Sequence, residues 1–220
     1  MNIAEMIDQS LLKPDVIRQQ IEQLCLEGRK YSFASICVNP VWVKLCKRLL
    51  YESTLKICTV SGFPLGASKP EVKAKEAEIA IEDGADEIDM VMNVGALKTG
   101  DFMLVEEDIK VVRRAIGKDK ILKVIIETGV LTNEEKVKAT EIIKACGADF
   151  VKTCTGFGYG DATIEDVKLL RKIAGGNMGV KASGGIRDYQ TAISLIQAGA
   201  NRIGTSSGVL IVQESLKKED

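Results

Sequence analysis

The chain has 220 residues, 45% of them hydrophobic, which is enough to bury a substantial core in one large domain or two small ones. Its 30 basic and 31 acidic residues are interspersed and give a formal charge of −1, so nothing in the charge pattern suggests nucleic acid or membrane as a partner. Histidine is absent, which excludes His-based catalytic triads and His-ligated zinc sites and leaves Lys, Asp, Glu, Cys, Tyr or water to move protons near neutral pH.

The cysteine pattern indicates free thiols in a cytoplasmic protein. The six cysteines are Cys25, Cys37, Cys46, Cys58, Cys146 and Cys154. None belongs to a C-x-x-C pair, and all lie among apolar neighbours in a chain too long to need disulfide staples. The first residues show no cationic segment followed by an apolar run, and no stretch approaches the roughly 20 apolar residues of a membrane helix.

The first half of the sequence predicts four strands, each followed by a helix. A short apolar segment over 7–12 is the weakest strand. Pro14 then opens a helix in which apolar residues recur at helical spacing until Gly28 ends it. The other predicted elements of this half are strands at 33–38, 55–60 and 87–92, a helix from 39, and a helix over 70–82.

The second half continues the alternation. A loop ending at Gly100 precedes the next helix, and the segment Thr132 to Glu135 has the residues of a capping box for a helix that ends near Cys146. The other predicted helices cover 101–116, 163–173, 188–198 and the segment from 208, and the strands are 121–126, the segments around Lys152 and Lys181, and 201–204.

Eight strand–helix units with short loops predict the fold class. Strands that are apolar on both faces indicate a parallel sheet covered by helices, and eight such units in roughly 200–250 residues is the size of a TIM barrel. A doubly wound open sheet is the alternative, but it usually has fewer repeats and a Gly-rich first turn, which is missing here. We therefore predict an α/β protein, with a single (β/α)8 TIM-barrel domain over residues 1–220.

Lys152 lies in an apolar, β-branched strand, where burial disfavours its charge. Two interpretations are open. Lys152 is a structural amine that reaches solvent or forms an ion pair, or it is an amine kept neutral so that it can attack a carbonyl. The pattern recurs at Lys181, and two buried amines repel as cations, so each favours the neutral form of the other. This second copy favours imine formation with an aldehyde or ketone.

Asp89 and Lys123 belong to strands that precede the two lysine strands. Because the functional groups of a barrel gather at the carboxyl ends of its strands, we expect both to converge with Lys152 and Lys181 on one cavity. The opposite face of the Asp89 strand is wholly apolar and suits the helix layer, which turns Asp89 inward. Asp89, or a water that it holds, would then move protons, whereas simple charge pairing in a polar layer accounts for Lys123 equally well.

Two Gly-rich loops predict a phosphorylated substrate. The segments 183–187 and 204–208 follow the seventh and eighth strands, the usual place of phosphate sites in barrels. Each supplies small residues and backbone N–H groups that receive anions. Arg187 either adds charge or sits solvated at the start of its helix. Cys37 lies near the aldehyde or, more simply, is a small core residue.

In combination, these segments resemble the deoxyribose-phosphate aldolase family from Ile7 to about Val212. The matching motifs are 36–40, 62–66, 84–91, 123–128, 150–157, 180–187 and 202–208. The resemblance implies a class I aldolase of nucleoside breakdown. It would reversibly cleave 2-deoxy-D-ribose 5-phosphate to D-glyceraldehyde 3-phosphate and acetaldehyde, without metal or cofactor. A phosphorylated sugar is then the expected partner, and a homodimer is one candidate assembly.

The resemblance also implies roles for individual residues. Lys152 falls on the Schiff-base lysine, Lys181 on the second lysine that keeps the first one neutral, and Asp89 on the acidic residue of the proton relay. The predicted substrate-binding and phosphate-binding residues are Gly156, Gly184, Gly185, Arg187, Gly204, Ser206 and Ser207.

Two departures from the family pattern affect the expectation. The family's Ile-Asp-His-Thr is Ile7-Asp8-Gln9-Ser10 here, so any tuning by that histidine is absent. Many members also carry a tail tyrosine that assists proton exchange, whereas residues 216–220 read Leu-Lys-Lys-Glu-Asp. We expect the core chemistry to survive and enamine protonation to be the step affected.

Two rival functions stay open on the sequence. One is another lysine-dependent aldolase, such as a transaldolase or a ketose-phosphate aldolase. The other is a catalytically silent barrel that binds sugar phosphates, against which the joint presence of Lys152, Lys181 and Asp89 argues.

Overall fold

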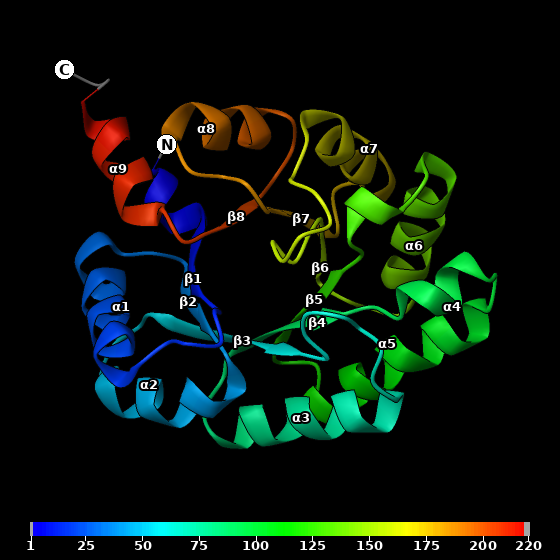
Figure 1. Cartoon of the computed structure of the whole chain (residues 1–220), viewed down its shortest axis with the longest axis horizontal. Coiled ribbons are helices and arrows are strands. Elements are labelled where there is room, and N and C mark those ends of the chain that lie inside the picture. The colour runs from blue at the N-terminus through cyan, green and yellow to red at the C-terminus, as the bar shows by residue number, and fades with distance from the viewer. Residues whose placement is uncertain (1, 218–220) are drawn as a thin grey trace.

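The computed structural model describes residues 2–217 and contains a closed barrel of eight parallel strands surrounded by helices (Figure 1). Each strand pairs with the next along the chain, and the first pairs with the last. The strands are β1 (Ile7–Leu11), β2 (Ser35–Val38), β3 (Lys56–Ser61), β4 (Glu87–Val91), β5 (Ile121–Ile125), β6 (Phe150–Lys152), β7 (Gly179–Ser183) and β8 (Arg202–Thr205). The predicted TIM barrel is confirmed. The last three residues of the tail that lacks a tyrosine, 218–220, lie outside the described residues.

Helices fill the connections between the strands and form the outer layer (Figure 1). The α-helices are α1 (Arg18–Tyr31), α2 (Val43–Leu49), α3 (Pro70–Glu82), α4 (Val94–Lys98), α5 (Phe102–Ile116), α6 (Asn133–Ala145), α7 (Ile164–Ala174), α8 (Tyr189–Gln197) and α9 (Gly208–Leu216). Short 3₁₀ turns are η1 (Ile3–Met6), η2 (Pro40–Trp42) and η3 (Thr128–Val130). Within residues 2–217, no helix combines the length and apolarity that a bilayer crossing requires.

The prediction for α1 is wrong at both ends. The helix begins after the predicted Pro14 start, and it ends where Ser32 adopts a left-handed conformation with φ 56°. Gly28 lies inside the helix. A Cβ at this position would come within 2.5 Å of Leu55 Cδ2 and 2.8 Å of Ile36 Cγ2. The glycine therefore serves the close approach of α1 to the barrel, not the end of the helix.

Side-chain caps set the starts of α4 and α6. Thr132 and Glu135 form the predicted capping box, in which the Glu135 N–H donates to Thr132 Oγ1 at 3.3 Å and the Thr132 N–H donates to Glu135 Oε2 at 2.8 Å. The sequence missed α4, which was predicted as loop. Its cap is Asn93, whose side chain accepts the Ala96 N–H at 3.0 Å.

The barrel has an apolar outer layer and a polar lumen. Ile88 and Met90 of β4 are fully buried in the hydrophobic core between sheet and helices. Asp89, between them, has the opposite orientation and is also fully buried. Lys123 and Lys181 are fully buried too, so the lumen holds several charged groups that only one another can neutralise.

Candidate active site

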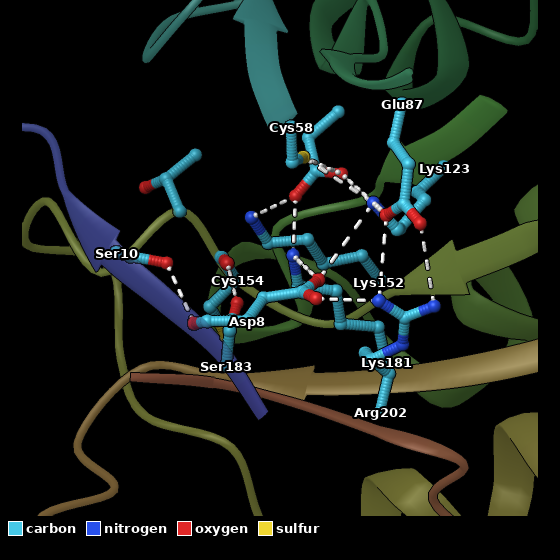
Figure 2. Close-up of polar contacts among 12 residues, drawn as sticks. Asp8, Ser10, Cys58, Glu87, Lys123, Lys152, Cys154, Lys181, Ser183 and Arg202 are labelled. Atoms are coloured by element: carbon cyan, nitrogen blue, oxygen red, sulfur yellow. Dashed lines mark hydrogen bonds and ion pairs between the residues drawn. The ribbon is translucent and has the colours of Figure 1, made fainter. Parts of the chain in front are cut away.

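The lumen gathers the predicted charged residues around Asp89. Its Oδ2 lies 2.8 Å from Lys152 Nζ and 2.6 Å from Lys181 Nζ. Its Oδ1 lies 2.8 Å from Lys123 Nζ. The register explains the cluster, because Lys123 pairs with Asp89 across β4 and β5, and Lys181 pairs with Lys152 across β6 and β7. One buried carboxylate therefore contacts three amines, whose side chains converge in Figure 2.

Sequence reasoning missed a second carboxylate, Asp8, which enters the lumen from β1. Asp8 accepts a hydrogen bond from Ser35 Oγ at 2.6 Å, and its other oxygen lies 2.5 Å from Lys181 Nζ. Arg202 Nη1 of β8 lies 2.5 Å from Asp8 (Figure 2). Since β1 and β8 close the barrel, Asp8 joins the two ends of the sheet as well as holding Lys181. The alternation of β1 was too weak to predict which way this aspartate points.

Lys123 has a full set of neutralising partners. Glu87 Oε2 lies 2.5 Å from its Nζ, and Cys58 Sγ lies 3.3 Å away (Figure 2). Cys58 in turn donates to Asp89 Oδ1 at 3.2 Å. These contacts favour the charge-pairing interpretation of Lys123. Cys37 lies fully buried with Cys58 in a small apolar cluster, which favours its interpretation as a core residue.

The carboxylates determine the charge of Lys181. Burial alone would raise the pKa of Asp89, but the surrounding ammonium groups, with Lys123 first among them, hold it well below its usual range. Burial alone would lower the pKa of Lys181, yet Asp8 and Asp89 raise it above its usual range. The expectation that a neighbouring lysine favours a neutral Lys181 is therefore wrong, because two carboxylates at 2.5 and 2.6 Å outweigh the repulsion.

A cavity of about 470 Å³ opens above Lys152, whose side chain lies at its inner end and is only 3% exposed. The predicted residues that line the cavity are Lys152, Gly156, Gly184, Gly185, Arg187, Gly204 and Ser206. Ser207 is not among the lining residues. The sequence did not predict Ser10, Lys13, Thr155 and Phe157, which line it as well. For Lys13 a signal existed, because it follows the carboxyl end of the first strand.

Glu127 is another residue that the sequence did not single out. Its backbone is left-handed, with φ 57°, an unusual conformation for a residue other than glycine. The buried carboxylate accepts hydrogen bonds from the Thr155 N–H at 3.2 Å and the Thr155 hydroxyl at 2.6 Å. Thr155 Oγ1 accepts the Phe157 N–H at 3.1 Å, and the Phe157 ring meets Phe63 edge-on. Glu127 thus fixes the loop that borders the cavity.

Comparison with known proteins gives the family. The model of the DeoC/LacD family aldolases matches residues 3–215. The chain belongs to this family. Deoxyribose-phosphate aldolase 1 of Bacillus licheniformis is 56% identical over 218 residues, covering 99% of this chain and 98% of that protein. Deoxyribose-phosphate aldolase of Clostridium tetani is 56% identical over 216 residues, covering 98% and 100%.

Solved structures agree with this family assignment. An aldolase described as QR15 superimposes with a TM-score of 0.94 at 45% identity, covering 99% of this chain and 97% of that one. Deoxyribose phosphate aldolase from Aeropyrum pernix, described as a tetramer, gives 0.90 at 33% identity, covering 99% and 92%. A DeoC/LacD aldolase barrel is therefore the scaffold on which the lysine cluster is built.

Proposed function

We propose that this chain is a class I aldolase that reversibly cleaves 2-deoxy-D-ribose 5-phosphate to D-glyceraldehyde 3-phosphate and acetaldehyde. One observation carries the proposal: Lys152, bound to the buried Asp89, forms the inner end of a cavity whose rim is two glycine-rich loops. The amine supplies a nucleophile for a carbonyl, and the loops supply N–H groups for a phosphate. The names of the related proteins support the same substrate.

The ion-pair network of the lumen contains one more basic group than carboxylates. Its ion pairs join the carboxylates of Asp8, Glu87 and Asp89 to the basic side chains of Lys123, Lys152, Lys181 and Arg202. With the other three basic groups charged, the three carboxylates are already matched. Lys152 is therefore not needed to neutralise this network, and its amine donates a hydrogen bond to Asp89 Oδ2 at 2.8 Å. Only an unprotonated amine attacks a carbonyl.

In the proposed mechanism, Lys152 Nζ attacks C1 of the open-chain sugar phosphate, and loss of water gives an iminium ion. A base then takes the proton of the C3 hydroxyl. The C2–C3 bond breaks, its electron pair moves into the iminium to form an enamine, and glyceraldehyde 3-phosphate leaves. The enamine is protonated at C2, and water hydrolyses the resulting iminium to acetaldehyde and free Lys152. The iminium is the electron sink, so the scheme requires neither metal nor cofactor.

Asp89 and Lys181 are the proposed proton carriers. Asp89 Oδ2 contacts both Nζ atoms, and Lys181 is the ammonium that returns a proton through an intervening water. Gly184, Gly185 and Ser206 are proposed to receive the phosphate, with Arg187 adding positive charge. Gly156, Gly204 and Ser207 complete the proposed binding set. We also propose that the whole chain is one catalytic domain and that it acts in nucleoside breakdown in the cytoplasm. A homodimer is the candidate assembly, and analytical ultracentrifugation tests it.

Borohydride trapping tests the proposal directly. Reduction in the presence of deoxyribose 5-phosphate should fix a two-carbon adduct on Lys152, identified by peptide mass spectrometry. Lys152→Ala should abolish acetaldehyde release, and Lys152→Arg should do so too, because a guanidinium stays protonated. Lys118→Ala, at an exposed site, is the matched control. An adduct on another residue would refute the role of Lys152, and products without acetaldehyde would favour a transaldolase or ketose-phosphate aldolase.

A further inference from the structure

Gln9 bridges two points of the β8–α9 segment, residues 205–208. The side chain belongs to β1 and is only 5% exposed. Its Oε1 accepts the Gly208 N–H at 2.9 Å, and its Nε2 donates to the Ser206 carbonyl at 3.3 Å. One amide thus binds the residues on either side of Ser207. Gln9 thus fixes the main chain at Ser206 and on the far side of Ser207.

The chain and the side chain are fitted closely at this point. A Cβ on Gly208 would lie 2.5 Å from Gln9 Oε1, so only glycine leaves room for the contact. Within the segment, Thr205 Oγ1 accepts the Ser207 N–H at 2.9 Å and donates to the Ile186 carbonyl at 2.6 Å. Gln9 therefore completes a set of hydrogen bonds that also connects the segment to the other glycine-rich loop.

Gln9 lies beside the cavity, not in it. It lines a separate hollow of about 320 Å³ between β1 and α1, which shares Ser10, Leu11 and Ser206 with the cavity above Lys152. Among the residues that line both hollows, Ser206 is the one whose main chain Gln9 binds, so the side chain acts on a bound substrate through that segment. Such a residue acts on one end of the substrate, the phosphate, and leaves the reacting carbon at Lys152 untouched.

We propose that Gln9 is a positioning residue that holds the β8–α9 segment in its anion-accepting shape and so sets the preference for phosphorylated over unphosphorylated sugars. This inference rests on the proposed function, which places the substrate phosphate at these loops. A merely structural role, closing β1 on β8, would weaken both kinds of substrate equally. The two roles therefore differ in what kinetics should show.

The test compares deoxyribose 5-phosphate with 2-deoxy-D-ribose in Gln9→Met, which keeps the length of the side chain, and in Gln9→Glu, which cannot donate to Ser206. KM for the phosphorylated sugar should rise about ten-fold, the usual effect of losing a buried hydrogen bond, while kcat/KM for deoxyribose stays within about two-fold. Gln9→His, whose neutral ring also offers one donor and one acceptor, should keep KM for the phosphorylated sugar near the wild-type value. Gln23→Met is the matched control, since Gln23 lines the same hollow but bonds to Glu27.

Three results would overturn the proposal. They are an equal fall in kcat/KM for both sugars, no change in kcat/KM for either sugar, or loss of folding in both Gln9→Met and Gln9→Glu. If the wild-type chain releases no acetaldehyde, the proposed function fails, and the role of Gln9 is then decided by binding alone. In that case inorganic phosphate is titrated into the wild type and Gln9→Met while the amide resonances of Ser206 and Gly208 are followed. The proposal expects about ten-fold weaker binding in the variant, and equal binding would refute it.

Discussion

Asp8→Asn is the sharpest test of the charged lumen. The substitution keeps the shape of the side chain and the acceptor for Ser35 but removes the charge that faces Lys181 and Arg202, each 2.5 Å away. Removing one partner of a fully buried ion pair typically costs about 3–5 kcal/mol, because the remaining charge loses its compensation. For a chain of this length, about 2–4 °C per kcal/mol converts that cost to a fall in melting temperature on the order of 6–20 °C.

The cost should depend on pH in a defined direction. Burial alone would raise the pKa of Asp8, but Lys181, Lys123 and Arg202 together hold it below its usual range. Because the pKa in the folded chain lies below the unfolded value of about 3.9, Asp8 contributes its full stabilisation above about pH 4 and loses it as the pH falls toward the folded value. The stability gap between wild type and variant should therefore be widest near neutral pH and narrow below about pH 4.

Urea unfolding followed by circular dichroism measures this gap at each pH. Asp15→Asn is the control, because Asp15 is exposed and its substitution should change stability by no more than about 0.5 kcal/mol. Equal stability of wild type and Asp8→Asn at pH 7 would refute the assignment of Asp8 as the shared partner of Lys181 and Arg202. A gap that widens on acidification would refute the sign of the pKa shift.

Three other substitutions test contacts outside this pair. Glu127→Ala, which strips the acceptor from Thr155, should raise KM for the proposed substrate about ten-fold, whereas Glu127→Gln keeps an acceptor; identical kinetics in both would contradict this. Gly28→Ala should destabilise by about 1–3 kcal/mol through overpacking, although alanine is the better helix former, and a higher melting temperature would argue against it. The buried Lys73 Nζ lies 2.7 Å from the buried Asp108 Oδ2, so Lys73→Met should lower the free energy of unfolding by about 3–5 kcal/mol by leaving Asp108 without its partner. Adding Asp108→Asn should restore most of that free energy, as measured by urea unfolding.

What the sequence predicted well is local. Before α6, an apolar run is followed by a capping box. This local pattern predicts a strand and the start of a helix without reference to any other element. Repetition of that unit eight times leaves few arrangements, so the barrel itself was predictable. The helix Val94–Lys98 was missed because five residues are too few for an apolar repeat to emerge. Gly28 was misread because its reason is a close approach to other elements.

The sequence predicted the lysines, Asp89 and most of the glycine-rich lining of the site, but not the other carboxylates or the charge of Lys181. Lys152 and Lys181 stand out because charged groups in apolar strands are costly. Their charge states depend on carboxylates whose positions follow from strand register, and Asp8 lies in the strand least visible in the sequence. The sequence therefore predicted the direction of the Lys181 pKa shift wrongly. Glu127 gave no signal, since nothing in its neighbours indicates a left-handed backbone.

The closure of β1 on β8 has a consequence for how the protein is made. Asp8 and Arg202 are 194 residues apart in the sequence, yet they share one ion pair in the finished barrel. Until a ribosome has delivered the last strand, β1 presents an open edge of the kind that recruits other chains, and Asp8 lacks its contact with Arg202. Contacts this remote form slowly. The nascent chain therefore keeps this edge open until the strand that closes the barrel has been made.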